Sequence, residues 1–308
     1  MISILLASYN GEKYVAEQID SLLSQTFQKF KLFIRDDCSN DGTFSIIKGY
    51  ANKHSDKIFA EQNKENSGGA KHNFFQMMLE YKDDYTMLCD QDDVWLPNKI
   101  ETTLTKMRSM ESEFGTCTPI LVHTDLRVVN EKLETISPSY KTSMNSDYNK
   151  TKLCNQIIQN TLTGCTAMYN RALAEMIAET PQFTVMHDWW LMITASAFGR
   201  IASIDTQTVL YRQHGGNAIG AKDIMTLKYK IKKLQHSTEI KKALRGTYQQ
   251  ARSFFNIYRD RLTTEQQKLL LTYSDIPNHN KFVRWLTICR LGTFKNGAAR
   301  KIAQVLYV

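Results

Sequence analysis

Three carboxylates stand within four residues, directly after an apolar run. Asp90, Asp92 and Asp93 follow residues 85–89, and an apolar run of that length bounded by polar residues predicts a buried strand. Side chains two positions apart on an extended chain point to the same face, so we expect Asp90 and Asp92 to project together. Carboxylates this close repel one another unless a cation lies among them, and their oxygen atoms suit Mg²⁺ or Mn²⁺.

A metal site built from these residues would leave room for a substrate. Mg²⁺ in proteins is commonly held by one or two carboxylates, and phosphate oxygens of the substrate fill the rest of its shell. The residues around Asp90 and Asp92 are therefore predicted to bind a divalent cation together with a diphosphate. The alternative interpretation is a solvated acidic turn before the next helix, whose start is indicated by Pro97 and Lys99.

Two further apolar runs end in polar side chains. Residues 2–7 and 30–34 are the runs, and the polar residues that follow include Ser8, Tyr9 and Asn10 in the first case and Asp36, Asp37 and Ser39 in the second. In open α/β sheets, ligands bind beyond the carboxyl ends of the strands. A carboxylate after the second strand can accept the N–H of a uracil or thymine ring, or a ribose hydroxyl. The three strand ends together predict a nucleotide-diphosphate site.

The elements that carry these residues alternate regularly. Apolar residues at helical spacing occur at residues 15–25, 44–50 and 74–81, and a short strand is expected at residues 58–61. Strand–helix alternation repeated three times predicts an α/β protein with a parallel, doubly wound sheet. Neither a P-loop pattern nor a G-x-G-x-x-G after the first strand is present in the sequence, which argues against the ordinary phosphate-binding loops.

The second half of the chain is less regular. Strands are expected at residues 120–129 and 201–211, helices at residues 171–179 and 189–198, and basic helices at residues 224–234, 254–262, 282–289 and 302–308. We therefore predict an α/β domain of residues 1–221 and a basic helical region of residues 222–308.

Positive charge is concentrated in that C-terminal region. From Lys222 onward the chain has 18 of its 39 Lys and Arg residues but only 5 of its 31 Asp and Glu residues, so this region carries a net charge of +13 and the remainder −5. Such asymmetry predicts an anionic partner for the tail alone. Basic residues beside apolar stripes, as around Trp285, are typical of helices that lie on an anionic membrane surface. Packing of these stripes on the protein itself is the alternative.

Composition places the protein in the globular class, with 42% hydrophobic residues. The six cysteines are scattered without a Cys-x-x-Cys pair, which indicates reduced thiols in a cytosolic protein. We see no signal peptide and no apolar stretch long enough to span a bilayer. The expected location is cytoplasmic, peripheral on the inner face of the membrane.

Four segments resemble the motifs of family 2 glycosyltransferases with the GT-A fold. They are ASYNGEKYVAEQIDSLLSQTFQKFKLFIRDDCSNDGT, LCDQDDVWLPNKI, HDWWLMITASAFG and VLYRQHGGN. The second is similar to the family's metal motif, and the last two resemble segments of bacterial rhamnosyltransferases. The resemblance covers about residues 1–217. It implies a GT-A-type, mostly parallel sheet flanked by helices, and inverting transfer of a sugar from a nucleotide diphosphate to a hydroxyl group.

The resemblance also implies roles for individual residues. Asp188 falls where inverting members have the catalytic base, Asp92 falls at a metal ligand, and His214 falls at a group that contacts metal or phosphate. Asp37 falls where the base of the donor is bound. The other residues implied at the nucleotide-sugar site are Ala7, Tyr9, Asn10, Asp36, Asn66, Asn73, Asp90 and Gln91. Ala7 departs from the family, in which many members have Thr.

Alternatives remain open for several of these positions. Asp188 also fits a plain helix N-cap, and His214 fits a loop histidine without a ligand. Asp36 is expected either to contact ribose or to hold its loop. Residues 163–165 are expected either to form the floor of the acceptor or donor site or to pack in the core.

The expected partners follow from the same resemblance. They are a dTDP-rhamnose or UDP-sugar donor, a glycan or lipid-linked acceptor in cell-surface polysaccharide synthesis, and Mg²⁺ or Mn²⁺. A sugar-phosphate nucleotidylyltransferase would also use a sheet and a metal, but it would normally show a Gly-rich signature with Arg and Lys after the first strand. A nucleic-acid-binding protein would explain the basic tail but not the acidic strand ends, which would repel phosphate. No nucleic acid partner is therefore expected.

Overall fold

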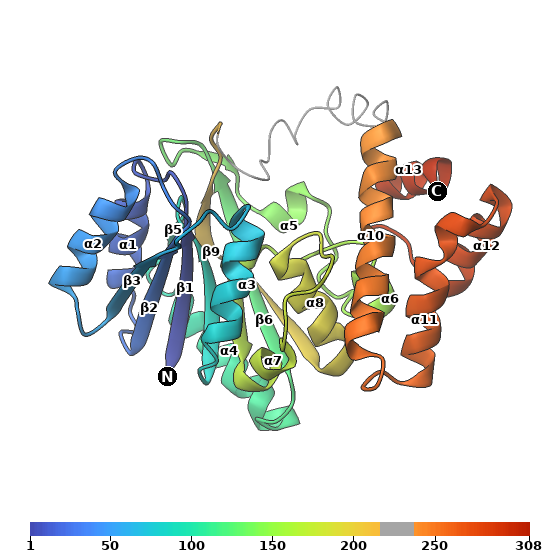
Figure 1. The fold of residues 1–308 in the computed structure, drawn as a ribbon, viewed down its shortest axis with the longest axis horizontal. Coiled ribbons are helices and arrows are strands. Elements are labelled where there is room, and N and C mark those ends of the chain that lie inside the picture. The colour runs from blue at the N-terminus through green and yellow to red at the C-terminus, as the bar shows by residue number, and fades with distance from the viewer. Residues whose placement is uncertain (216–236) are drawn as a thin grey trace. The chain divides into compact units, whose positions relative to one another are not determined.

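The protein is represented by a computed structural model that describes residues 1–215 and 237–308. Within these residues, nine strands form one sheet in the order β3-β2-β1-β4-β8-β6-β9-β5, and β7 pairs with β6 (Figure 1). The strands are β1 (Ile2–Ser8), β2 (Phe30–Asp36), β3 (Ile58–Gln62), β4 (Tyr85–Asp90), β5 (Val94–Trp95), β6 (Ile120–Val129), β7 (Thr135–Ser137), β8 (Ala167–Asn170) and β9 (Arg200–Arg212). The helix expected at residues 224–234 lies outside the described residues.

Most strands of the sheet run in one direction. β1 pairs in parallel with β2 and β4, β2 with β3, and β6 with β9. β8 is antiparallel to both β4 and β6, while β5 and β7 are antiparallel to β9 and β6. Strands β1, β2, β3, β4, β6 and β9 therefore share one direction. The predicted α/β class, with a mostly parallel sheet flanked by helices, is confirmed.

Helices alternate with the first four strands as predicted. They are α1 (Val15–Leu23), α2 (Thr43–Lys53), α3 (Ala70–Glu80) and α4 (Lys99–Phe114), followed later by α7 (Arg171–Met176). α3 packs against β1, and α4 packs against β6, β8 and β9. Successive residues Ile4, Leu5 and Leu6 of β1 are all fully buried. A strand with a continuous apolar sequence is buried on both faces, so β1 lies in the centre of the core.

The carboxyl ends of the first strands meet at one edge. In the register of the sheet, Ser8 pairs with Asp36, Asp36 with Gln62, and Ala7 with Asp90. The polar residues that follow β1, β2 and β4 therefore lie along the same edge, as predicted from the strand ends.

The chain divides into two compact units. Among the described residues, the first contains 1–140, 162–180 and 199–215, and the second contains 141–161, 181–198 and 237–308. The first unit holds the whole sheet. The second includes α8 (His187–Phe198), which the boundary expected at residue 221 had assigned to the α/β domain. The second unit is thus built from three separate stretches of chain.

Aromatic packing explains why α8 belongs with the C-terminal helices. The other elements of the second unit include α6 (Leu153–Gln156), α10 (Ser237–Tyr258), α11 (Thr264–Ser274), α12 (Lys281–Leu291) and α13 (Ala298–Tyr307). In the sequence, the first stretch of the first unit ends at Tyr140, the first residue of the short α5 (Tyr140–Ser143), and the rest of α5 belongs to the second unit. The ring of Trp190 on α8 lies 5.2 Å from that of Phe254 and 6.2 Å from that of Tyr258.

Among the described helices, none has both the length and the apolar character needed to cross a bilayer.

Candidate functional site

Asp36 closes the turn after β2. One carboxylate oxygen accepts hydrogen bonds from the hydroxyls of Ser8 (3.0 Å) and Ser39 (2.5 Å). The other accepts from the backbone N–H of Ser39 and the side-chain amide of Gln62, both at 2.9 Å. A carboxylate has about four acceptor positions, and these four bonds fill them. The geometry therefore favours the loop-holding role for Asp36 over contact with ribose.

Asp37 is enclosed by the loop between β3 and α3. Its Oδ1 accepts from the backbone N–H of Ser67 (2.7 Å) and the amide of Asn63 (2.8 Å), and its Oδ2 accepts from the Ser67 hydroxyl (2.8 Å). Asn66 donates to the Asp37 carbonyl at 2.8 Å. The two glycines after Ser67 have φ of 91° and 122°, a conformation that suits glycine and lets the loop bend back over the carboxylate.

Asn73 and Ala7 are buried beneath the residues that follow β1 and β2. Asn73 is 1% exposed, and its amide donates to the Arg35 carbonyl at 2.9 Å. Ala7 is 9% exposed and pairs with Arg35 and Asp90 in the sheet. Both residues support the site from within.

Gln91 joins the end of β1 to the turn after β4. Its amide oxygen accepts from the Tyr9 N–H and its amide nitrogen donates to the Tyr9 carbonyl, both at 2.8 Å. Gly11 lies so close to Gln91 that a Cβ on Gly11 would collide with the side-chain amide of Gln91. Asn10 has φ of 47° and its N–H donates to the Ser39 hydroxyl at 2.8 Å. The ring of Tyr9 is left exposed, and a ligand can reach it.

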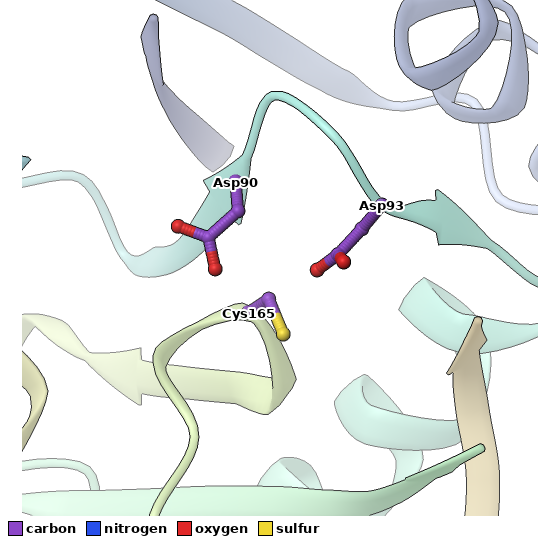
Figure 2. Close-up of side chains that lie close together, drawn as sticks. All are labelled: Asp90, Asp93 and Cys165. Atoms are coloured by element: carbon purple, nitrogen blue, oxygen red, sulfur yellow. The ribbon is translucent and has the colours of Figure 1, made fainter. Parts of the chain in front are cut away.

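The chain turns between β4 and β5. β4 ends at Asp90, residues 91–92 form a turn, and β5 begins at Val94. The backbone is not extended from Asp90 to Asp92, so the assumption behind the expected pairing of these two carboxylates does not hold. Asp90 instead meets Asp93 and Cys165, whose ligand atoms all lie within 4.8 Å of one another (Figure 2).

Asp92 lies beside His214, which follows the end of β9. The His214 Nε2 and Asp92 Oδ2 atoms are 2.7 Å apart, and the side chains are 13% and 16% exposed. The structure thus brings together the two residues predicted as metal ligands. A carboxylate oxygen and an imidazole nitrogen at this separation fit one divalent cation, whose coordination would replace the hydrogen bond between them.

Arg212 fixes the turn that carries Asp92. Its Nε donates to the Asp92 carbonyl (2.8 Å), one terminal nitrogen donates to the Glu131 carbonyl (2.6 Å), and the other pairs with the Glu17 carboxylate. The Arg212 backbone N–H donates to Asp93 Oδ1 at 3.2 Å. The side chain is 3% exposed. This residue connects β9, α1 and the turn after β4.

Tyr14 contacts both Arg212 and His214, one of the two residues predicted as metal ligands. The guanidinium carbon of Arg212 lies 4.9 Å from the Tyr14 ring centroid, and the Tyr14 and His214 rings are 4.7 Å apart. Sequence analysis did not single out Arg212 or Tyr14. The signal available for Arg212 was a charged residue at the end of an apolar strand, within the segment VLYRQHGGN.

A buried group of ionisable side chains lies beside the turn. Asp93, Lys99 and Cys165 are at most 1% exposed. Burial raises the pKa of Asp93 well above its ordinary value, and the neighbouring carboxylates raise it further. Burial also raises the pKa of the Cys165 thiol and lowers the pKa of Lys99 to about 8. The Lys99 ammonium lies over the ring of Trp95, 4.5 Å from its centroid.

Asp188 belongs to the second unit, whereas all the residues above belong to the first. It is the second residue of α8 and is 8% exposed. Its Oδ1 accepts from the Trp189 N–H at 2.6 Å. Because α8 begins at His187, Asp188 lies in the first turn rather than at the N-cap. A carboxylate in the first turn is stabilised by the helix dipole.

Comparisons with known proteins were made for both sequence and fold. The model of the family described as glycosyl transferase family 2 matches residues 3–177. The dTDP-rhamnosyl transferase RfbG of Shigella flexneri is 26% identical over 239 residues, which are 73% of this chain and 77% of that protein. The putative glycosyltransferase EpsE of Bacillus subtilis is 37% identical over 100 residues, covering 32% of this chain and 36% of EpsE.

Solved structures with similar folds include two glycosyltransferases. TarS 1–349 of S. aureus in complex with UDP-GlcNAc superposes with a TM-score of 0.58 at 18% identity, over 99% of this chain and 90% of that one. The mannosyltransferase PcManGT of Pyrobaculum calidifontis, in complex with GDP-Man and Mn²⁺, gives a TM-score of 0.54 at 14% identity, over 94% and 84%. At these identities the likeness shows that the fold is shared.

The contacts of Arg212 predict a large effect on stability. Arg212→Met removes the donor from the part-buried carbonyls of Asp92 and Glu131 and the cation from the Glu17 carboxylate. Because a hydrogen bond to a charged group contributes about 1.5–3 kcal/mol, we expect a loss of at least that order. Arg212→Lys keeps the positive charge but not the forked arrangement of N–H donors. The free energy of unfolding should therefore fall less in Arg212→Lys than in Arg212→Met. The free energy of unfolding, measured by urea denaturation, checks both.

Arg245→Met, at an exposed position of α10, is the matched control and should change stability by less than about 0.5 kcal/mol. If Arg212→Met were as stable as this control, Arg212 would not hold the turn.

Proposed function

Because the chain belongs to glycosyl transferase family 2, we propose that it is an inverting enzyme of cell-surface polysaccharide synthesis. It moves a sugar from a nucleotide diphosphate to a hydroxyl group of a glycan or lipid-linked acceptor. The observation that carries the proposal is the edge of the sheet where β1, β2 and β4 end, which gathers Tyr9, Asp37 and the Asp92–His214 pair. The family match gives no support to a nucleotidylyltransferase or a nucleic-acid-binding protein.

Asp37 is assigned to bind the nucleobase of the donor. Its carboxylate can accept the imide N–H of a uracil or thymine ring, and the exposed ring of Tyr9 lies on the neighbouring strand end. Ser67 and Asn63 donate three hydrogen bonds to the Asp37 carboxylate, which leaves one of its about four acceptor positions for the imide N–H.

Asp92 and His214 are assigned to the divalent cation. Mg²⁺ prefers oxygen ligands alone, whereas Mn²⁺ binds imidazole nitrogen more readily, so this pair favours Mn²⁺ over Mg²⁺. When bound, the cation would neutralise the diphosphate leaving group. The contacts of Gln91 and Arg212 hold the turn in place, with Asp90 at the end of β4 beside the diphosphate.

Asp188 is assigned as the general base. Inverting transfer requires one carboxylate to take the proton of the acceptor hydroxyl as that oxygen attacks the anomeric carbon. Asp188 lies in the first turn of α8, next to Trp189, whose indole N–H donates to the Gln156 carbonyl at 2.6 Å.

The donor sugar is proposed to be L-rhamnose carried on dTDP. The support is the resemblance to rhamnosyltransferases and the similarity to RfbG, which extends over most of both chains. A UDP-sugar is the second candidate, because TarS, which shares the fold, binds UDP-GlcNAc. A thymine and a uracil ring present the same imide N–H to Asp37, so the sugar pocket has to discriminate between these donors.

A donor screen tests the reaction and its metal together. Purified protein incubated with dTDP-rhamnose, UDP-GlcNAc or GDP-mannose should release nucleoside diphosphate from dTDP-rhamnose in the presence of Mn²⁺, and less with Mg²⁺. EDTA should abolish the release. Asp92→Ala should lose turnover by about 10²-fold or more, because a misplaced or absent cation removes leaving-group stabilisation.

Asp56→Ala, at an exposed position in the same unit, should keep full activity. Undiminished turnover in EDTA would refute the metal assignment, and turnover of UDP-GlcNAc alone would refute the rhamnose assignment.

The role of Asp188 predicts a specific kinetic pattern. Asp188→Asn keeps the shape and removes the basicity, so turnover should fall by about 10²- to 10⁴-fold while the Kd for the donor changes little. Asp260→Asn, exposed in the same unit, serves as the control. If donor affinity collapses while bound donor is still turned over, Asp188 is a binding residue and not the base.

We also propose that α12 and α13 attach the enzyme to the cytoplasmic face of an anionic membrane, where a lipid-linked acceptor would be presented. Phe282, Trp285 and Leu286 lie at helical spacing on α12 and are 69%, 42% and 46% exposed. Lys281 and Arg290 lie on the same helix. On α13, Ile302 and Leu306 are 56% and 53% exposed and follow Arg300 and Lys301.

Exposed apolar residues beside basic ones match the chemistry of an anionic bilayer surface. Each Lys or Arg near such a surface contributes about 1 kcal/mol to binding. The basic residues Lys228, Lys230, Lys232 and Lys233, which also suggested docking, lie outside the described residues.

Vesicle sedimentation tests this attachment. The protein should sediment with phosphatidylglycerol vesicles at low salt and be released at high salt. Substitution of Phe282, Trp285 and Leu286 by Ser should weaken binding at least about tenfold, since apolar burial stabilises the docked state. The control variant Ile136→Ser replaces an apolar residue of β7 that is 45% exposed. This variant should bind the vesicles as tightly as the unmodified protein does. Equal binding by the triple variant would refute docking through α12.

A further inference from the structure

Three side chains from two segments of the chain meet beside the turn after β4. Asp90 ends β4, Asp93 precedes β5, and Cys165 lies in the short 3₁₀ helix at residues 164–166. The two carboxylates and the thiol lie close together (Figure 2), and their ligand atoms are all within 4.8 Å of one another. None of these residues is one of the pair assigned to the catalytic cation.

The cluster contains an unsatisfied acceptor. Asp93 is 0% exposed, and one of its oxygens accepts the backbone N–H of Arg212. Its other oxygen, Oδ2, has no hydrogen-bond partner among the described residues. A buried carboxylate oxygen without a partner costs free energy, and Figure 2 shows the Asp93 carboxylate turned toward Asp90 and Cys165. The orphaned atom thus lies where a bound cation would satisfy it.

The charges of the cluster also match one divalent cation. With its thiol deprotonated, the group of Asp90, Asp93 and Cys165 carries three negative charges. Lys99 is fully buried, and its ammonium group contributes one positive charge. The sum of minus two is neutralised by a single dication. In a buried environment such neutralisation matters, because unpaired charges are strongly disfavoured there.

We infer that Asp90, Asp93 and Cys165 form a second metal site, selective for a thiophilic cation such as Zn²⁺, whose occupation inhibits the transferase. Two carboxylate oxygens and one thiolate leave a fourth position of a tetrahedral zinc shell open for water. Binding releases the proton of the Cys165 thiol, and that of the Asp93 carboxyl group, to solvent. Asp90 is only partly buried and provides the route of entry.

Ligand type separates this site from that of the catalytic cation. Thiolate sulfur favours Zn²⁺ and other soft cations over Mg²⁺ and Mn²⁺, which bind the Asp92–His214 pair. Zn²⁺ at the second site withdraws the Asp90 carboxylate from the donor. It also places two positive charges next to the turn that holds Asp92, which disfavours the catalytic cation. The inhibition rests on the proposed function, whereas the metal binding does not.

Co²⁺ reports directly on the sulfur ligand. The full-length protein titrated with Co²⁺ should show a sulfur-to-cobalt charge-transfer band in the near ultraviolet, and Zn²⁺ should displace it. Cys165→Ala should lose the band. Asp93→Asn keeps the shape and the thiol but loses a charged ligand, so its Co²⁺ affinity should fall at least about tenfold.

A matched variant removes the exposed thiols instead. Cys117→Ser combined with Cys289→Ser eliminates two exposed cysteines and should keep the band. In the transferase assay with Mn²⁺, Cys165→Ala should need at least about tenfold more Zn²⁺ for half inhibition. Circular dichroism verifies that each variant is folded.

Three results would overturn the proposal. They are absence of the band in the unmodified protein, its persistence in Cys165→Ala, and equal Zn²⁺ inhibition of Cys165→Ala and the unmodified enzyme. If no donor is turned over at all, the proposed function fails while the cobalt spectrum still decides whether the metal site exists.

Discussion

The geometry of the candidate cation ligands depends on the buried guanidinium of Arg212. This group binds the Asp92 and Glu131 carbonyls and the Glu17 carboxylate, and it stacks on Tyr14. A guanidinium is planar and offers five N–H donors in fixed directions. It can therefore hold a backbone turn, a strand end and a helix in one arrangement, which a lysine could not reproduce. The Asp92–His214 pair is preorganised because the turn beside it is already fixed before any ligand binds.

Elements with strong periodicity were predictable from the sequence. The apolar runs of β1, β2 and β4, and the rule that parallel strands end at a common edge, place Asp37 and Asp92 on one side of the sheet. The start of α4 at Lys99 followed from Pro97. The side-by-side arrangement of Asp90 and Asp92 did not follow, because the two-residue alternation applies only while the backbone is extended, and the chain turns after Asp90.

Features that depend on contacts distant in sequence could not be predicted. Arg212 reaches Glu131 across 81 positions and Glu17 across 195. The assignment of α8 to the second unit depends on the packing of Trp190 against Phe254. The charge asymmetry of the sequence predicted a single domain boundary at residue 221 and contained no information about this packing. α11 (Thr264–Ser274) was missed because its leucines form one run at residues 269–271 and do not recur at helical spacing. Its capping box, in which Thr263 and Gln266 bond reciprocally, was a usable signal.

The order of the strands has a consequence for synthesis on the ribosome. Strands β1–β4 can pair with one another as soon as residue 90 has emerged, since their partners all lie upstream. The other edge of β4 waits for β8, which pairs Tyr85 with Asn170, and the turn after β4 waits for Arg212. N-terminal segments generally fold first during translation. A nascent chain therefore acquires four of the nine described strands early but lacks the Arg212 contacts that fix the turn after β4 until β9 is complete, so translation order itself delays completion of the candidate site.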